Sequence, residues 1–150
     1  MQGPSLHHFG NVKDYRRSIV EMNINITDED FEKLIAKALD ELPKEQTANL
    51  NNVAITFGSS PTPDQAKKLK LRGDSLLLGL YEGIPLTRRT GNYSLVLPDK
   101  ITIFKDQILK LAKDKTQLFA IVKHTLWHEI AHFYGLDHEQ IHKIEGHWKT

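Results

Sequence analysis

The longest periodic segment of the sequence, Lys115 to Tyr134, carries two histidines one helical turn apart near its end. Apolar residues recur along the segment at helical spacing: Leu118, Phe119, Val122, Leu126, Ile130 and Phe133. We therefore expect a long helix that forms the buried spine of the fold. Because residues four apart share one face of a helix, His128 and His132 can offer ring nitrogens to a single metal ion.

The residues around this histidine pair complete the pattern of a catalytic metal site. Glu129 follows His128 and is rotated by about a third of a turn, so its carboxylate can take a proton from metal-bound water. Gly135 can adopt the left-handed conformation that ends a helix, and the chain can then return His138 as a third ligand. Three protein ligands leave one position of a tetrahedral zinc ion open. The spacing predicts zinc on the three histidines, with Glu129 as general base.

A simpler interpretation is a helix end whose histidines interact with the helix dipole while Gly135 caps the turn. By chance, a bare His-Glu-x-x-His arises in about one chain in 40 of this composition. Adding Gly135 and His138 at their offsets lowers that frequency to about one in ten thousand. The metal site is therefore the favoured interpretation.

Composition narrows the class of protein and the chemistry of the site. The chain has 150 residues and no cysteine, so disulfides and thiolate ligands are excluded and a metal must use nitrogen and oxygen donors. The 39% hydrophobic and 26% charged residues are typical of one globular domain. A net charge of +1 argues against nucleic acid or a membrane as partner. Without a signal-like or membrane-spanning apolar run, we expect a cytoplasmic protein.

The chain is expected to form one domain, residues 21–150, after a poorly structured N-terminal segment, residues 1–20, which lacks periodicity. Thr27, followed three residues later by Asp30, predicts a helix that continues with apolar residues at helical spacing until Pro43. Strands are predicted at the alternating or apolar runs 53–57, 76–81, 93–97 and 101–104. Short helices are predicted over residues 63–72 and 139–145.

Two parts of the sequence together resemble a known family. One part comprises residues 77–89, Leu-Leu-Gly-Leu-Tyr-Glu-Gly-Ile-Pro-Leu-Thr-Arg-Arg, with residues 97–104, Leu-Pro-Asp-Lys-Ile-Thr-Ile-Phe; the other is the motif at 128–138. They are similar to the zincin-like metallopeptidases of bacteria, the minimal zincins, over roughly residues 31–142. The resemblance implies a compact α+β domain, in which a small mixed sheet packs on a long zinc-binding helix, and zinc-dependent hydrolysis of peptide bonds.

The family's site residues carry over one by one. His128 and His132 match its metal pair, and Glu129 matches its catalytic acid/base. The family often has aspartate at the third ligand position, where this chain has His138. Asp137 and His142 compete for that role, although His138 has the better spacing for a three-histidine site.

Two other families share part of the motif. The metzincins place a methionine turn after the third ligand, but Met1 and Met22, the two methionines of this chain, lie far upstream. The bacterial rRNA maturation factors share the pattern His-x-x-x-His-x-x-Gly-x-Asp-His but typically have glycine where this chain has Glu129. A zinc-dependent endoribonuclease that processes rRNA is therefore the first alternative function. A non-catalytic metal-binding domain is the second.

Several other residues have two interpretations each. Arg88 or Arg89 could steady the oxyanion of a tetrahedral intermediate, although an ion pair is the commoner role. Tyr81 or Tyr93 could donate to the same oxyanion, although tyrosines in strands usually pack in the core. His124, one turn before the metal pair, could support the site or be a partly buried histidine.

The expected partner is a peptide or protein substrate. An extended peptide could pair with an exposed sheet edge, which we expect at the strand 101–104. Asp137 could accept a hydrogen bond from a ligating imidazole, or it could shape the turn after Gly135.

Overall fold

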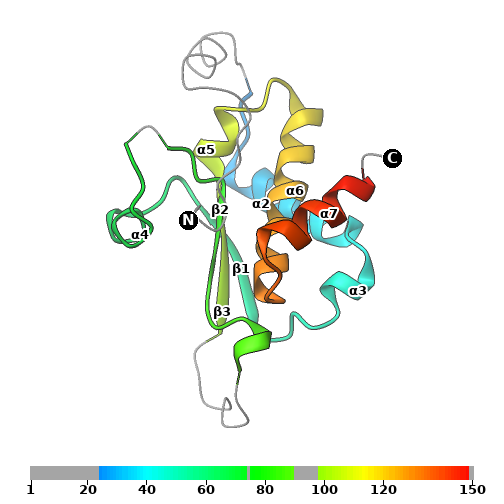
Figure 1. The fold of residues 1–150 in the computed structure, drawn as a ribbon. Helices are drawn as coiled ribbons and strands as arrows, with labels where there is room; N and C mark the ends of the chain where they lie inside the picture. The colour runs from blue at the N-terminus through cyan, green and yellow to red at the C-terminus, as the bar shows by residue number, and fades with distance from the viewer. Residues whose placement is uncertain (1–23, 74, 90–97, 149–150) are drawn as a thin grey trace.

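Within the described residues, three strands form one mixed sheet in the order β1-β3-β2 (Figure 1). The strands are β1 (Val53–Gly58), β2 (Gly79–Glu82) and β3 (Asp99–Phe104). β3 runs parallel to β1 and antiparallel to β2, so that Ile101 lies opposite Ile55 on one side and Tyr81 on the other. The strands predicted at 53–57 and 101–104 are confirmed, and the apolar run 76–81 becomes a strand from Gly79 onward.

The central position of β3 contradicts one prediction. We expected the strand at 101–104 to offer an open edge to a peptide, but both of its edges are paired within the sheet. Its apolar residues are buried on both faces, with Ile101 and Ile103 at 0% exposure and Phe104 at 1%. Such burial is typical of a central strand.

The computed structural model of the protein describes residues 24–73, 75–89 and 98–148, with the backbone alone at residues 147 and 148. The predicted N-terminal segment, residues 1–20, and the predicted strand at 93–97 lie outside these ranges. The division into a segment 1–20 and a domain 21–150 therefore stays a prediction.

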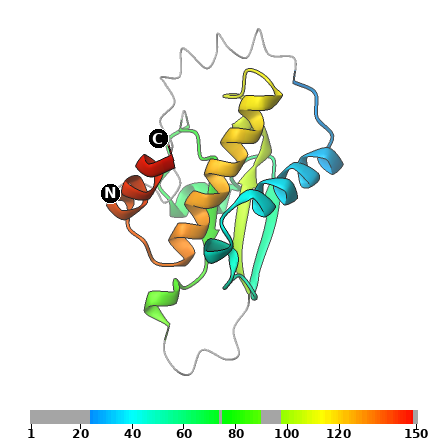
Figure 2. The same cartoon turned by 90° about the vertical axis from the view of Figure 1, so that its right-hand side faces the viewer.

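Two helices, α2 (Asp28–Glu41) and α6 (Lys115–Phe133), pack on the same face of the sheet (Figures 1 and 2). α2 begins as predicted, because the Thr27 hydroxyl accepts a hydrogen bond from the Asp30 amide over 3.1 Å. At α6, the Asp114 carboxylate accepts from the Gln117 amide over 2.7 Å. These caps satisfy amides that a helix start would otherwise leave without partners.

The core lies between α2, α6 and the sheet. Its fully buried side chains include Phe31 and Ala38 of α2, Ile101 of β3, and Leu126 and Ile130 of α6. The second half of α6 is buried on more than the predicted stripe, because every residue from 125 to 131 is buried. α6 is therefore the interior spine of the fold, as the sequence predicts.

The remaining elements are short. They are α3 (Lys44–Thr47), α4 (Pro63–Lys68), the 3-10 helix η1 (Leu86–Arg88), α5 (Lys105–Leu109) and α7 (His138–Trp148). The predicted helices at 63–72 and 139–145 correspond to α4 and α7. No helix in the described part of the chain has the length and apolar character needed to cross a membrane. The α+β class, with a small mixed sheet packed on α6, is confirmed.

Candidate metal centre

The end of α6 turns the chain back toward its own histidines. The amide of Gly135 donates to the carbonyl of His132 over 2.9 Å, and the amide of Leu136 donates to that of Ala131 over 3.0 Å. Together these bonds form a Schellman ending, in which Gly135 has the predicted left-handed conformation, with φ of +84°. The reversal lets α7 begin at His138.

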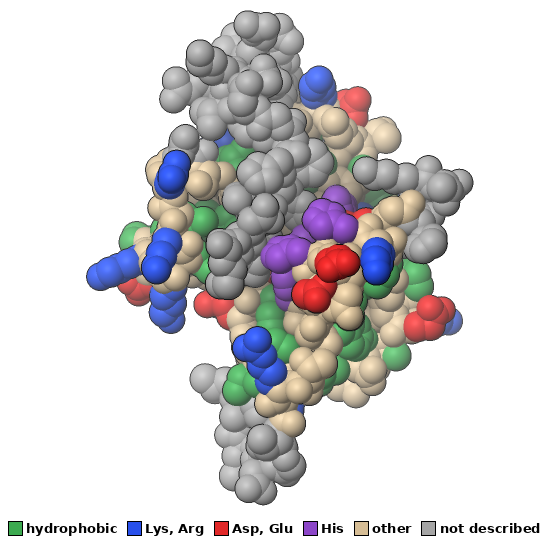
Figure 3. All heavy atoms as spheres, in the orientation of Figure 1, with side chains coloured by type: hydrophobic (Ala, Val, Ile, Leu, Met, Phe, Trp, Pro, Cys, Tyr) green, Lys and Arg blue, Asp and Glu red, His purple; other side chains and the backbone are tan. Residues whose placement is uncertain are grey.

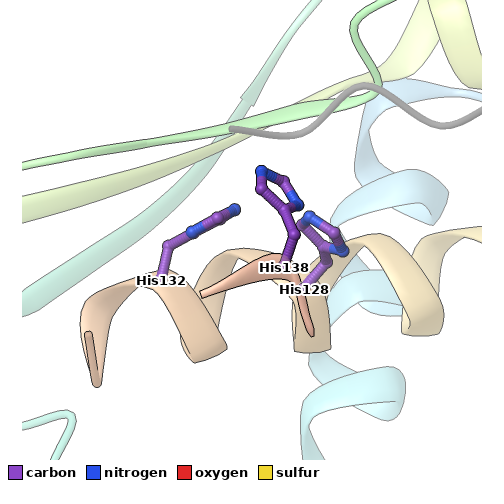
Figure 4. A group of neighbouring side chains, drawn as sticks. All are labelled: His128, His132 and His138. Atoms are coloured by element: carbon purple, nitrogen blue, oxygen red, sulfur yellow. The ribbon is translucent and has the colours of Figure 1, made fainter. Parts of the chain in front are cut away.

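Three imidazole rings meet where α7 begins (Figure 4). His128 and His132 extend from α6, and His138 is the first residue of α7. One ligand nitrogen of each lies within 4.8 Å of the other two. The ring centroids lie 4.9 Å apart for the pair on α6, and 5.7 and 5.2 Å from His138 to His128 and His132. The structure brings the three predicted ligands together, whereas their binding of a metal stays a prediction.

The donor set of this histidine trio fits a zinc ion. Imidazole nitrogens lie about 2.0–2.1 Å from tetrahedral zinc and therefore about 3.3–3.4 Å from one another. The ligand nitrogens seen here, all within 4.8 Å of one another, approach this spacing. His128 is 4% exposed and held by packing, whereas His132 and His138 are half-buried. Histidine side chains gather in one place on this face of the molecule (Figure 3).

Glu129, next to His128 in the chain, has the environment expected of an acid/base residue. Its side chain is 0% exposed, and neither carboxyl oxygen accepts a hydrogen bond from the described residues. Burial raises the pKa of Glu129 well above its usual value, and the backbone amide of Tyr81 opposes this rise without reaching hydrogen-bond geometry. A buried carboxyl in this condition is costly unless a cation or a water molecule approaches it.

Gly79 of β2 makes room for this carboxyl group. A Cβ atom on Gly79 would lie 2.6 Å from Cγ2 of Thr125, and 3.3 Å from both Cγ of Glu129 and the carbonyl oxygen of Thr102. A side chain at this position would therefore push β2 away from α6. The absence of one lets the edge strand lie directly against the predicted general base.

The two other candidates for the third ligand have different partners. Asp137 accepts a hydrogen bond from the amide of Gln140 over 2.8 Å, and its own amide donates to the Gln140 side chain over 2.9 Å. This reciprocal pair caps the start of α7. The side chain of His142 is 73% exposed and lies near Glu145, with 3.8 Å between Nδ1 and Oε1. Within the described residues, the group able to hold a metal contains neither candidate.

The tyrosine and arginine considered for the oxyanion belong to a buried polar network. Asp99 is 2% exposed and accepts hydrogen bonds from the Tyr81 hydroxyl, over 2.6 Å, and from the Arg89 guanidinium. Arg89 also donates to the carbonyl of Ile84 over 2.9 Å, and its guanidinium carbon lies 5.4 Å from the centre of the Phe133 ring. Burial, together with the bond to Asp99, raises the pKa of Tyr81 far above its usual value, so the phenol stays protonated.

Asp99 is not among the site residues predicted from the sequence, although it lies in the segment that carries the family resemblance. An aspartate that opens a strand is usually solvent-exposed, so its burial is not visible in the sequence. Arg88 is exposed, and Tyr93 lies outside the described residues.

His124 pairs with a residue of α7 and also lies near one of the predicted metal ligands. Its Nε2 atom pairs with Oε2 of Glu145, whose side chain is 11% exposed. The ring of His124 lies 6.5 Å from that of His128, with an angle of 77° between the planes. Glu145 is not among the site residues predicted from the sequence, because its partner His124 is 21 positions away and on another helix.

Comparison with known proteins relates the sequence to a family and to a solved structure. The sequence profile of a family described as zincin-like metallopeptidase matches residues 50–148. This range includes all of α6 and α7, and hence the histidine trio and Glu129. No curated protein matches the chain. A conserved hypothetical protein from Thermo thermophilus has 23% sequence identity and a TM-score of 0.47, covering 81% of this chain and 99% of that one.

Proposed function

This chain belongs to the zincin-like metallopeptidase family, and on that basis we propose that it is a zinc-dependent peptidase. One observation carries the proposal. Three ring nitrogens lie within 4.8 Å of one another, on the helix that also bears a fully buried carboxyl group, Glu129, and on the helix that follows it. Metal binding requires the first feature, and hydrolysis by an activated water requires the second.

The metal ligands in this proposal are His128, His132 and His138. A bound zinc ion supplies polarisation of a carbonyl group and a lowered pKa of water. Three neutral imidazoles leave the positive charge of such an ion undiminished and leave one coordination position open. The buried position of His128 provides a rigid anchor, whereas His132 and His138 are half-buried, so we expect a substrate to approach the ion from their side.

Glu129 moves the proton. Its carboxylate accepts a proton from water as the water oxygen bonds to the scissile carbonyl carbon, and it then donates that proton to the leaving amine as the C–N bond breaks. Its burial excludes other water from the carboxylate. The close approach of β2 at Gly79 limits the space in which the side chain can rotate.

A peptide substrate is supported by the neighbouring edge strand. Among the described residues β2 forms one edge of the sheet, and its Gly79 lies against Glu129. An extended peptide that pairs with β2 as a further strand would pass beside this carboxylate. With a net charge of +1, we expect neither nucleic acid nor a membrane as partner. A cytoplasmic location stays a prediction.

The proposal is tested by assays with denatured casein and with rRNA, each with and without a chelator. We expect casein to be cleaved only when metal is present. The variant Glu129→Gln should keep its zinc but lose about 10²- to 10⁴-fold in turnover, because the amide accepts no proton. Glu139→Gln is the matched control, since the Glu139 side chain is 81% exposed on α7 and should be silent.

Two outcomes would overturn the proposal. Unchanged turnover in Glu129→Gln would remove this residue from the chemistry. Metal-dependent cleavage of rRNA, with casein left intact, would favour the endoribonuclease.

A further inference from the structure

The helix that brings the third ligand, α7, meets the rest of the molecule along one face. Its 11 residues begin with His138, and the faces of residues three, four and seven apart coincide on a helix. Ile141, one turn on, is 0% exposed and packs in the core. Glu145, two turns from His138, has a side chain only 11% exposed. One face of α7 therefore carries the predicted ligand, a core residue and a carboxylate: His138, Ile141 and Glu145.

The matching face lies on α6. His128 sits opposite His138, with 5.7 Å between the ring centroids. His124, one turn earlier on α6, pairs with Glu145. The earlier residue of α6, His124, pairs with the later residue of α7, Glu145, and the later residue of α6, His128, lies near the first residue of α7, His138. The two helices are thus joined in antiparallel register by one pair at the metal site and another two turns along α7.

The second pair matters because α7 is short. Isolated helices of fewer than about 12 to 15 residues are marginal in water, so the position of α7 depends on its contacts with the rest of the fold. Ile141 and Ile144 pack α7 against the core. The pair between His124 and Glu145 adds a specific contact between α6 and α7, two turns along α7 from the metal site.

We propose that Glu145 is a positioning residue of the metal centre. By pairing with His124 it holds α7 in the register along α6 that brings His138 to His128 and His132. The inference rests on the histidine trio of the proposed function, but it does not depend on which bond the enzyme breaks.

The test compares Glu145→Ala with Glu145→Gln, and uses Glu139→Ala as the matched control. Zinc affinity is measured by competition with a chromophoric chelator, and the visible spectrum of the cobalt(II) protein reports the ligand set. Glu145→Ala should lose about 10- to 100-fold in zinc affinity, the range typical of residues that orient ligands. Glu145→Gln, which keeps an acceptor oxygen for His124, should recover part of that loss. Glu139→Ala should match the wild type, because its side chain is exposed and pairs within α7 at Lys143.

A second series shows whether the effect passes through His138. In a His138→Ala background, Glu145→Ala should cause no further loss of zinc affinity, because the ligand that it positions is already absent. Urea unfolding of the metal-free variants separates a general loss of stability from a loss of ligand placement. If Glu145→Ala unfolds, Glu145→Gln replaces it. Its effect on zinc affinity is then compared in the wild-type and His138→Ala backgrounds.

Three results would overturn the inference. One is an additive loss in the double variant, which would make Glu145 act independently of His138. Another is an unchanged affinity and cobalt spectrum in Glu145→Ala. The third is binding of two cobalt ions with loss of one in Glu145→Ala, which would make His124 and Glu145 ligands of a second metal. The two proposals fail separately. If the zinc affinities change as expected but no peptide is cleaved, the proposed function is wrong and the positioning role of Glu145 is still supported.

Discussion

At Gly79 the backbone of β2 approaches α6 so closely that a methyl group would meet Thr125 at 2.6 Å and Glu129 at 3.3 Å. The position of the predicted general base is therefore set partly by a residue that has no side chain.

We expect Gly79→Ala to lower turnover by about 10- to 100-fold, because a displacement of about 1 Å in a catalytic group can have an effect of that size. Zinc affinity should change little, since the three atoms nearest the added methyl group belong to Thr125, Glu129 and Thr102 and not to a histidine. The matched control is Gly58→Ala in β1, where a Cβ atom would meet only Cγ2 of Thr102, at an ordinary 3.9 Å, among the described residues. Equal turnover in the two variants, measured on a chromogenic peptide, would contradict this role for Gly79.

Arg89→Ala tests whether the arginine acts on the substrate or on the fold. Asp99 is 2% exposed, so loss of its guanidinium partner should lower the free energy of unfolding by about 3 to 5 kcal/mol, as for other broken buried pairs. Turnover per folded molecule should stay within about twofold, while the exposed Arg88→Ala should alter stability by no more than about 0.5 kcal/mol. Urea unfolding and active-site titration measure the two quantities. A large fall in turnover with an unchanged free energy of unfolding would show that Arg89 acts on the oxyanion of the reaction and not on the fold.

At the scale of elements, the join between α6 and α7 decides whether a third ligand is available. α6 ends at a left-handed glycine, and α7 begins at a reciprocal cap between Asp137 and Gln140. Both features are local, and both were visible in the sequence as glycine and aspartate at the ends of helical patterns.

Substitutions at Asp137 distinguish a cap from a ligand. Asparagine caps helices about as well as aspartate, so Asp137→Asn should keep wild-type zinc affinity. Asp137→Ala should remove about 0.5 to 2 kcal/mol from the stability of α7 and weaken zinc binding, because His138 is the next residue. Competition with a chelator measures both affinities. Equal losses in the two variants would show that the negative charge of Asp137 acts on the metal or on a ligating imidazole.

The core of the molecule is held together by apolar contacts between elements far apart in the sequence. Phe31 of α2, Ile101 of β3 and Leu126 of α6 are each 0% exposed and belong to one hydrophobic cluster. The fold should therefore persist without metal, unlike that of small domains whose structure depends on zinc.

Removal of metal should lower the melting temperature and leave a cooperative transition. Zinc at 100 times its dissociation constant should add about 2.7 kcal/mol to the free energy of unfolding. Circular dichroism during heating, with zinc or with a chelator, measures the difference. Loss of the folded baseline after chelation would favour the non-catalytic domain in which the metal serves folding.

Patterns within one segment were sufficient to predict most elements and the histidine trio. The Thr27 cap, the length of α6 and the left-handed Gly135 follow from interactions between residues a few positions apart, whose geometry is the same in any fold. His128 and His132 share a helix face for the same reason, and His138 follows after a short turn of the chain.

Contacts between distant segments were decided only by the tertiary structure. The sequence contains no signal that makes β3 the central strand, because pairing order depends on which faces the helices cover. It also leaves open that Asp99 is buried under Arg89, and that Glu145 reaches His124 across two helices. The sequence does not show whether a carboxylate is exposed to water or buried against a partner, because burial depends on how the whole chain packs.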